Sequence, residues 1–328
     1  MTSRYCLYTA VLPPYRQACL EILIAKLGPE WTAYAGDRHL DPTVRSAGNV
    51  GLYVPILNVT LLGRRVLLQW GHWEVALRVD TAILDLNPRS ISTWLLLLMR
   101  RLLRRRTLLW GHLHPRAGAG ARSAGFRTWM RRLADGCIVY SYADAESVRA
   151  KFPSEPVWVA PNALYRSAEM GVVPGQVRDT YLYVGRLEPM KKPELLLAAF
   201  AQLAESHPDR HLVFVGGGAS TEQLQATVES LGLQRQVSFL GVVHSLGDLR
   251  ALYSRAICSV SPGYAGLSLT QSLCFGAPMV VAESEPHAPE IELTVTGDVT
   301  FFRSDSTEEL AATLLDPDLQ LTDAERLR

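Results

Sequence analysis

The chain has 328 residues, of which 48% are hydrophobic and 20% charged, and its formal net charge at pH 7 is +1. This composition is typical of a globular protein with a large core, and the length suits two domains. The sequence lacks a run of about 18 consecutive apolar residues, which excludes a membrane-spanning helix on sequence pattern.

The small net charge conceals an asymmetry between the two halves of the chain. Residues 1–170 hold 22 Lys and Arg against 12 Asp and Glu, a balance of +10, whereas residues 171–328 hold 11 against 20, a balance of −9. A basic half predicts an anionic partner such as a membrane surface or a lipid phosphate, and scattered surface arginines are the alternative. A nucleic acid is not expected, because the basic residues lack interleaved aromatic side chains and no recognition module is visible.

The cysteines form no C-x-x-C pairs and mostly lie in apolar runs, which is typical of buried free thiols. They are Cys6, Cys19, Cys137, Cys258 and Cys274. Because the N-terminus shows no signal-peptide pattern, we expect a cytoplasmic protein, with peripheral association at the inner face of the plasma membrane as a further expectation.

Apolar runs alternate with helical patterns along the whole chain, which predicts parallel α/β sheets. In residues 1–170, a helix is expected over Arg16–Leu27, and another begins near Ser90 or Ser92, either of which is a suitable N-cap. The strands expected in this half are Tyr5–Ala10, Val66–Gln69, Thr81–Leu86, Thr107–Trp110, Gly136–Tyr140 and Val157–Val159.

The same alternation continues beyond a linker at Arg166–Arg178. The strands expected there are Thr180–Val184, Leu212–Val215, Val237–Leu240, Ala256–Val260 and Pro278–Ala282, and the helices are Pro193–His207, Thr221–Leu231, Leu246–Tyr253 and Thr270–Phe275. The sequence therefore predicts two doubly wound parallel-sheet domains, at residues 1–170 and 171–328, facing each other across a central cleft. Ligands of open parallel sheets bind where the strands end, which draws attention to the loops at Gly185, Gly216, Gly241 and Ser261.

Two of these loops have the chemistry of a phosphate site. Residues 261–292 read as a strand end, a glycine-containing loop, a helix start and a second strand, and the N–H groups of a helix N-terminus can hold a phosphate. Residues 185–192, Gly-Arg-Leu-Glu-Pro-Met-Lys-Lys, place an arginine and two lysines just beyond a strand, as a pyrophosphate requires. A solvated basic loop is the alternative.

Taken together, four blocks resemble the C-terminal domain of the group 1 (family 4) glycosyltransferases in order and spacing. They are Gly185-Arg186-Leu187 with Lys191, Leu212–Gly216, Val237–Gly241 and residues 261–292. The resemblance covers residues 134–316. It implies the GT-B fold of two Rossmann-like domains and a retaining enzyme that uses a nucleotide sugar. The pattern around Tyr264 and Gln271 further resembles a bacterial subgroup linked with surface polysaccharide assembly.

The resemblance implies roles for individual donor-side residues. Arg186 and Lys191 would hold the donor diphosphate and offset charge on the departing nucleotide, which is the main electrostatic work of such a reaction. The amides of Gly266, Leu267 and Ser268 would cradle the same phosphates. Lys192 stands where the family usually has glycine.

The base pocket and the acidic positions depart further from the family's pattern. Leu240 would line the base pocket. The family has two glutamates eight positions apart, and here those positions hold Gly263, which has no side chain, and Gln271, whose amide oxygen can still accept a hydrogen bond from a ribose hydroxyl. Glu290, in a Pro-Glu pair that the family shares, is the predicted donor-binding carboxylate, and a loop glutamate that caps a helix is the alternative. Glu283, Glu285 and the histidine His287 are further donor-side candidates.

The first half offers candidates for the acceptor side. His112 follows a predicted strand in a loop where related enzymes often present an active-site histidine, and His72 follows another strand. Arg89 stands at a third strand end and could meet an anionic acceptor. The alternatives are structural histidines beside tryptophans and, for Arg89, part of a helix-capping turn. No metal site is expected, because His112 and His114 are two residues apart and lack a third ligand.

Residues 94–106 form a basic amphipathic pattern. Leu95, Leu98, Met99, Leu102 and Leu103 fall on one helical face, and Arg100, Arg101, Arg104, Arg105 and Arg106 gather near the C-terminal end. The pattern suits an anionic bilayer surface. The alternative is a crossover helix that packs these leucines on the sheet and leaves the arginines solvated.

The sequence thus predicts a cofactor-free and metal-independent enzyme that moves a hexose from a nucleotide sugar to a glycan or lipid-linked glycan in surface polysaccharide synthesis. Residues 1–170 would bind the acceptor and residues 171–328 the donor. The alternatives are a non-catalytic relative that binds a nucleotide sugar or a partner protein, and a nucleotide-sugar epimerase on the same fold.

Overall fold

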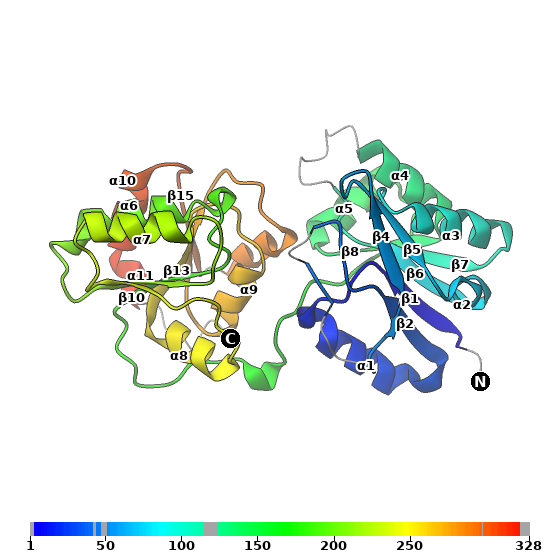
Figure 1. Ribbon diagram of the computed structural model, residues 1–328, viewed down its shortest axis with the longest axis horizontal. Helices are drawn as coiled ribbons and strands as arrows, with labels where there is room; N and C mark the ends of the chain where they lie inside the picture. The colour runs from blue at the N-terminus through cyan, green and yellow to red at the C-terminus, as the bar shows by residue number, and fades with distance from the viewer. Residues whose placement is uncertain (1–2, 42–43, 47–50, 115–123, 297, 322–328) are drawn as a thin grey trace. The chain divides into compact units, whose positions relative to one another are not determined.

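The computed structural model describes residues 3–41, 44–46, 51–114, 124–296 and 298–321. The chain divides into two compact units, Met1–Ala163 and Leu164–Arg328 (Figure 1). The predicted domain boundary after residue 170 lies just inside the second unit, beyond the 3-10 helix η3 (Ser167–Glu169).

The first unit is built on a seven-stranded parallel sheet in the order β3-β2-β1-β6-β7-β8-β9. The strands are β1 (Tyr5–Thr9), β2 (Trp31–Ala35), β3 (Val54–Pro55), β6 (Thr81–Asp85), β7 (Arg106–Trp110), β8 (Gly136–Val139) and β9 (Val157–Val159). The helices are η1 (Pro14–Arg16), α1 (Gln17–Leu27), η2 (Gly28–Glu30), α2 (Trp73–Arg78), α3 (Ile91–Leu102), α4 (Ala124–Leu133) and α5 (Tyr142–Lys151). The strand order reverses between β1 and β6, so the crevice at their carboxyl ends is the expected ligand position.

One predicted strand of this unit lies outside the parallel sheet. Val66–Gln69 is extended, as predicted, but the strand β5 (Val66–Trp70) pairs antiparallel with β4 (Leu57–Leu61) in a separate two-stranded ribbon. Leu62, Gly63 and Arg64 between them all have positive φ. A tight turn of this kind joins antiparallel strands, whereas parallel strands need a long crossover.

The second unit has a six-stranded parallel sheet in the order β12-β11-β10-β13-β14-β15. The strands are β10 (Thr180–Val184), β11 (His211–Val215), β12 (Val237–Phe239), β13 (Ala256–Ser261), β14 (Met279–Ala282) and β15 (Val299–Phe302). The helices are η4 (Pro189–Lys191), α6 (Pro193–Ala204), α7 (Thr221–Ser230), α8 (Leu246–Arg255), α9 (Leu267–Cys274), η5 (Pro289–Thr296), α10 (Thr307–Leu314) and α11 (Pro317–Leu321). Counted from β10, the order is 3-2-1-4-5-6, that of a dinucleotide-binding domain, with its switch point between β10 and β13.

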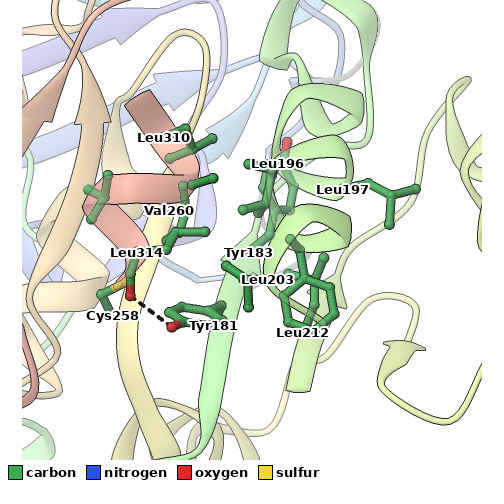
Figure 2. Packing of buried hydrophobic residues seen from close by; sticks show 14 of the residues in the cluster. Tyr181, Tyr183, Leu196, Leu197, Leu203, Leu212, Cys258, Val260, Leu310 and Leu314 are labelled. Atoms are coloured by element: carbon green, nitrogen blue, oxygen red, sulfur yellow. Dashed lines mark hydrogen bonds between the residues drawn. The ribbon is translucent and has the colours of Figure 1, made fainter. Parts of the chain in front are cut away.

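The core of the second unit holds β10 in place. Leu196 and Leu203 of α6 pack against the β10 tyrosines, together with Leu314 of α10 (Figure 2). The Tyr181 hydroxyl is buried and donates to the carbonyl of Leu314 at 2.8 Å, which satisfies the polar end of a large apolar side chain. Helices α6 and α10, which contact each other, thereby set the position from which the loop after β10 departs.

Helix α3 begins at one of the two predicted N-caps, but it ends before the basic pattern predicted over residues 94–106 does. Ser90 is its N-cap, with Oγ accepting from the amide of Thr93 at 3.2 Å, so the helix starts at Ile91. It ends at Leu102, because Arg104 adopts a left-handed conformation and Arg106 already belongs to β7.

The prediction that Arg100 is one of the solvent-facing arginines is wrong. Its side chain is fully buried. The guanidinium donates to the carbonyls of Val79 and Arg106, at 3.2 and 2.6 Å, and to that of Ala76. A buried cation is tolerated when carbonyl oxygens accept its hydrogen bonds in this way. Arg100 therefore joins the segment before β6 to the start of β7 from inside the unit.

Candidate functional site

The switch point of the second unit brings two predicted donor-side loops together. The loop after β10 carries Arg186, which is half-buried, and continues through η4 to Lys191. The loop after β13 runs through Gly263 and Tyr264 to α9. The Lys191 Nζ donates to the Tyr264 carbonyl at 2.5 Å and lies 4.2 Å from the centroid of its ring. Lys191 therefore connects the two loops at the crevice where parallel sheets bind ligands.

Backbone hydrogen bonds join the loops after β10, β11 and β12. The amide of Leu187 donates to the carbonyl of Gly217 at 3.0 Å, and the amide of Gly216 donates to the carbonyl of Gly241 at 2.7 Å. Gly216 has a φ of +131°, and a Cβ there would lie 1.9 Å from the carbonyl oxygen of Gly185. This close approach excludes any side chain at Gly216. The predicted loops thus lie at one edge of the sheet, with Leu240 exposed just beyond β12.

Helix α9 supplies the amides predicted to hold phosphate. Gly266 is its N-cap and is buried, whereas Leu267 and Ser268 are half-buried. The first amides of any helix have no partner within it, and the helix dipole favours an anion at that end. The N-terminus of α9 directly follows the loop that Lys191 contacts.

His287 holds the entry to this helix. Its Nδ1 accepts from the amide of Ala265 at 3.0 Å, and its Nε2 lies 2.8 Å from the carbonyl oxygen of Ala282. These partners assign the proton to Nε2, and burial lowers the pKa of the ring. Because both nitrogens are engaged within the unit, His287 supports the loop from inside, in place of the donor contact that the sequence suggested.

Gly263 explains one departure from the family's pattern. The residue is buried, and a Cβ built on it would lie 2.7 Å from the carbonyl oxygen of Met190 and 2.8 Å from the carbonyl carbon of Lys191. These are backbone atoms, so a side chain requires the η4 segment to move. The segment that carries Lys191 occupies the space that a glutamate at this position would need.

Gln271 is held by two tyrosines. Its Nε2 donates to the Tyr165 hydroxyl at 2.5 Å, and its Oε1 accepts from the Tyr253 hydroxyl at 3.3 Å. Burial raises the pKa of both tyrosines, so they are neutral hydrogen-bonding groups at physiological pH. Contact between Gln271 and a ribose hydroxyl stays a prediction.

Lys192 stands at the position where the family usually has glycine. Its backbone is left-handed, with a φ of +51°, a conformation that glycine adopts at little cost. Its Nζ lies 2.5 Å from Glu285 Oε1 and 2.6 Å from Asp305 Oδ1, so the ammonium ties η4 to the loops after β14 and β15. Glu285 is thereby engaged in an ion pair. Glu290 is buried in η5, which contacts α9.

In the first unit, His112 follows β7 and is exposed, with its ring packed edge-on against Tyr140 at 4.7 Å between centroids. His72 is the N-cap of α2, in a left-handed conformation, and stacks on Tyr34 at 5.0 Å. Because β5 is antiparallel, His72 does not follow a strand of the parallel sheet. Arg89 donates to the carbonyls of the β4–β5 turn, at 2.6 and 2.8 Å, and so fastens that ribbon.

Sequence reasoning missed a carboxylate at the switch point of the first unit. Asp85 ends β6, and its two oxygens accept from the Thr9 hydroxyl and the Ala10 amide, each at 2.6 Å. Burial raises the pKa of this carboxyl. The sequence signal that could have identified this carboxylate is an aspartate at the end of a largely apolar strand.

A cationic cluster, also missed, lies in the same unit. The Arg16 guanidinium lies 4.3 Å from the Trp110 ring and donates to the hydroxyl of Tyr140, the residue on which His112 packs. We call these four residues the Arg16 cluster. It places a cation and a histidine just beyond the ends of β7 and β8, and its positive charge opposes the effect of burial on Asp85.

In the part of the chain that the structure describes, His, Cys, Asp and Glu side chains do not gather into a group of three able to hold a metal ion. Within the same part of the chain, each helix is too short or too polar to cross a bilayer. Metal independence of any reaction stays a prediction.

Residues 175–320 match the family model described as "Glycosyl transferases group 1". The chain is 31% identical over 123 residues to a D-inositol 3-phosphate glycosyltransferase of Segniliparus rotundus, covering 35% of this chain and 27% of that protein. It is 29% identical over 167 residues to the uncharacterized glycosyltransferase YqgM of Bacillus subtilis, and the match covers 48% of this chain and 46% of YqgM. These matches span from about a quarter to about half the length of the curated relatives.

Solved structures resemble the chain over nearly its full length. Anabaena Alr3699/HepE, crystallised in complex with UDP, has a TM-score of 0.71 at 17% identity and covers 100% of this chain and 93% of its own. Sucrose-phosphate synthase from Thermosynechococcus elongatus has a TM-score of 0.63 at 18% identity, and the match covers 99% of this chain and 94% of the synthase chain. The likeness confirms the predicted GT-B fold class.

Proposed function

We propose that the chain is a group 1 glycosyltransferase, whose family model matches residues 175–320, and that it is a retaining transferase that takes its sugar from a UDP-sugar. The choice of nucleotide follows HepE, whose structures contain UDP and UDP-glucose. A hexose is the proposed donor sugar. The proposed acceptor is a glycan or lipid-linked glycan in bacterial surface polysaccharide synthesis.

The observation that carries this proposal is the convergence at the β10–β13 switch point. The Lys191 ammonium contacts the Tyr264 loop, which leads directly into the N-terminus of α9. Arg186, Lys191 and the first amides of α9 therefore supply positive charge from two loops. A diphosphate is the anion whose size and charge suit such a site.

In the proposed reaction, the bond between the anomeric carbon and the diphosphate oxygen breaks, and the acceptor hydroxyl oxygen bonds to that carbon on the same face. The hydroxyl proton passes to the departing diphosphate. Arg186, Lys191 and the amides of α9 would stabilise the negative charge that develops on the leaving group. The second unit would thus bind the donor and the first unit the acceptor, with His112, His72 and Arg89 as acceptor-side candidates.

The test is UDP release from a panel of UDP-sugars by the full-length protein. Arg186→Ala and Lys191→Ala should each lower the rate more than about tenfold, since removal of one charge-stabilising group typically costs that much or more. Lys192→Gly is the matched control, because it removes a lysine from the same loop whose ammonium is engaged by Glu285 and Asp305. Near-normal rates for Lys191→Ala would contradict the proposed roles.

A second candidate function is nucleotide-sugar binding without turnover. It is favoured by Gly263 and Gln271, which replace the family's paired glutamates, and by the steric exclusion of a side chain at Gly263. Calorimetry separates the two functions: a non-catalytic relative would bind UDP-sugar with Lys191-dependent affinity yet release no UDP with any acceptor. Product analysis without acceptor would reveal an epimerase.

A further inference from the structure

Helix α3 exposes an apolar stripe to solvent. Residues at spacings of three and four along it are at least two-fifths exposed, and Leu102 is 84% exposed. The stripe consists of Ile91, Leu95, Leu98, Met99 and Leu102. The opposite face, with Leu96 and Leu97, is buried in the core. The alternative in which the exposed leucines pack on the sheet is therefore wrong, because that place is already filled.

Helix α4 extends this stripe. Its Phe126 and Trp129 are 54% and 56% exposed. The Trp129 ring lies 5.0 Å from that of Trp94 on α3, and the two helices run side by side (Figure 1). We call the stripe on α3 together with Phe126 and Trp129 the α3–α4 face. Two neighbouring helices thus present one apolar surface with aromatic side chains, and such surfaces on soluble proteins mark interaction sites.

The charge around the α3–α4 face is predominantly positive. Residues 86–134 contain eleven arginines and no Asp or Glu. Arg100 and Arg131 are buried and do not contribute to the surface. Exposed arginines at the ends of the two helices do contribute, namely Arg101, Arg104, Arg105 and Arg132. Asp80 contacts this rim from the end of α2, through an ion pair with Arg105 at 3.2 Å.

We propose that the α3–α4 face docks on an anionic lipid bilayer, with its apolar side chains among the acyl chains just below the headgroups and its arginines at the lipid phosphates. Exposed leucines and aromatic residues flanked by cations are the pattern of an interfacial helix, and apolar burial and charge act together in such binding. The proposal is independent of the proposed donor site, because every residue involved lies in the first unit.

Charge favours a lipid over a second copy of this chain. A symmetric dimer through the α3–α4 face would bring the arginines of one copy against those of the other. Residues 86–134 offer no carboxylate to neutralise them. A bilayer of anionic lipids supplies many negative charges and an apolar layer at the depth that the stripe requires.

The test is co-sedimentation of the full-length protein with vesicles of phosphatidylglycerol and phosphatidylcholine, or of phosphatidylcholine alone. We expect at least about tenfold stronger binding to the anionic vesicles at low salt, weakening as salt is raised. The double variant Leu98→Glu/Leu102→Glu should lose most of this binding, since it places charges on exposed positions of the stripe. Leu231→Glu/Val242→Glu is the matched control, because it adds the same charge at exposed positions of the second unit.

A charge variant gives an independent measure. Arg101→Gln/Arg104→Gln should weaken binding to anionic vesicles and reduce its salt dependence without lowering the melting temperature. The melting temperature of every variant serves as the folding control. UDP binding is proposed for the second unit, so its loss would concern the proposed function and not the membrane proposal. Equal binding to both vesicle types would overturn the proposal. So would a concentration-dependent dimer that Leu98→Glu/Leu102→Glu abolishes, which would assign the face to a second copy.

Discussion

Replacement of Gly263 by alanine tests whether the η4 segment and the β13 loop are packed as closely as the structure shows. The added Cβ would lie 2.7 Å from the carbonyl oxygen of Met190 and 2.8 Å from the carbonyl carbon of Lys191. Reaching even a 3.0 Å contact requires a displacement of at least 0.3 Å, the difference between 3.0 and 2.7 Å. Because both contacts are with backbone, the segment carrying Lys191 has to move as a whole.

Overpacking of this kind typically costs about 1–3 kcal/mol. For a domain of this size each kcal/mol corresponds to about 2–4 °C, so the melting temperature of Gly263→Ala should fall by about 2–12 °C. Its affinity for UDP should fall by about tenfold or more, since positioning errors of this order weaken preorganised sites strongly. Gly263→Glu, which introduces the family's residue, should weaken UDP binding further and give no higher activity than the natural chain.

The assays are thermal unfolding and calorimetric titration with UDP. Gly217→Ala is the matched control in a neighbouring loop, because a Cβ at Gly217 meets nothing within 4 Å. The reasoning is refuted if Gly263→Ala equals Gly217→Ala in both melting temperature and UDP affinity. A Gly263→Glu variant with higher activity than the natural chain would refute it as well.

Two further predictions concern buried groups. Burial lowers the pKa of His287, so the neutral ring contributes to stability at pH values above 6.5, the ordinary pKa of histidine, and this contribution is lost as the pH falls below 6.5. Urea unfolding at pH 7 and at pH 5 should show the loss. His287→Ala should be less stable by about 1–3 kcal/mol at pH 7 and should show less of this pH dependence. Identical pH dependence in both proteins would speak against it. Arg100→Met should destabilise the first unit by about 2–4 kcal/mol, because buried carbonyls lose their donor, whereas the exposed neighbour Arg101→Met should be nearly neutral in the same measurement.

Much of the fold follows from local sequence pattern. Apolar runs and helical spacing located most strands of the two parallel sheets, but not β2, β3 or β15. The capping pattern placed the start of α3 near Ser90 or Ser92, and Ser90 is the N-cap. The loops proposed to bind phosphate could also be chosen from the sequence. Glycines and cations just beyond apolar strands, at Gly185–Lys192 and around Gly263, have a local physical meaning that needs no knowledge of distant residues.

Other features depend on residues far apart in the chain. Helix α3 is apolar on two faces, and only the packing of its Leu96 side against the sheet decides that the Leu98 side is exposed. Gly263 reads as a lost side chain in the sequence, whereas the structure shows Met190 backbone in its place. Periodicity reports which residues share a face of one element. Which face is covered, and which backbone approaches it, is set by through-space neighbours that only the tertiary structure brings together.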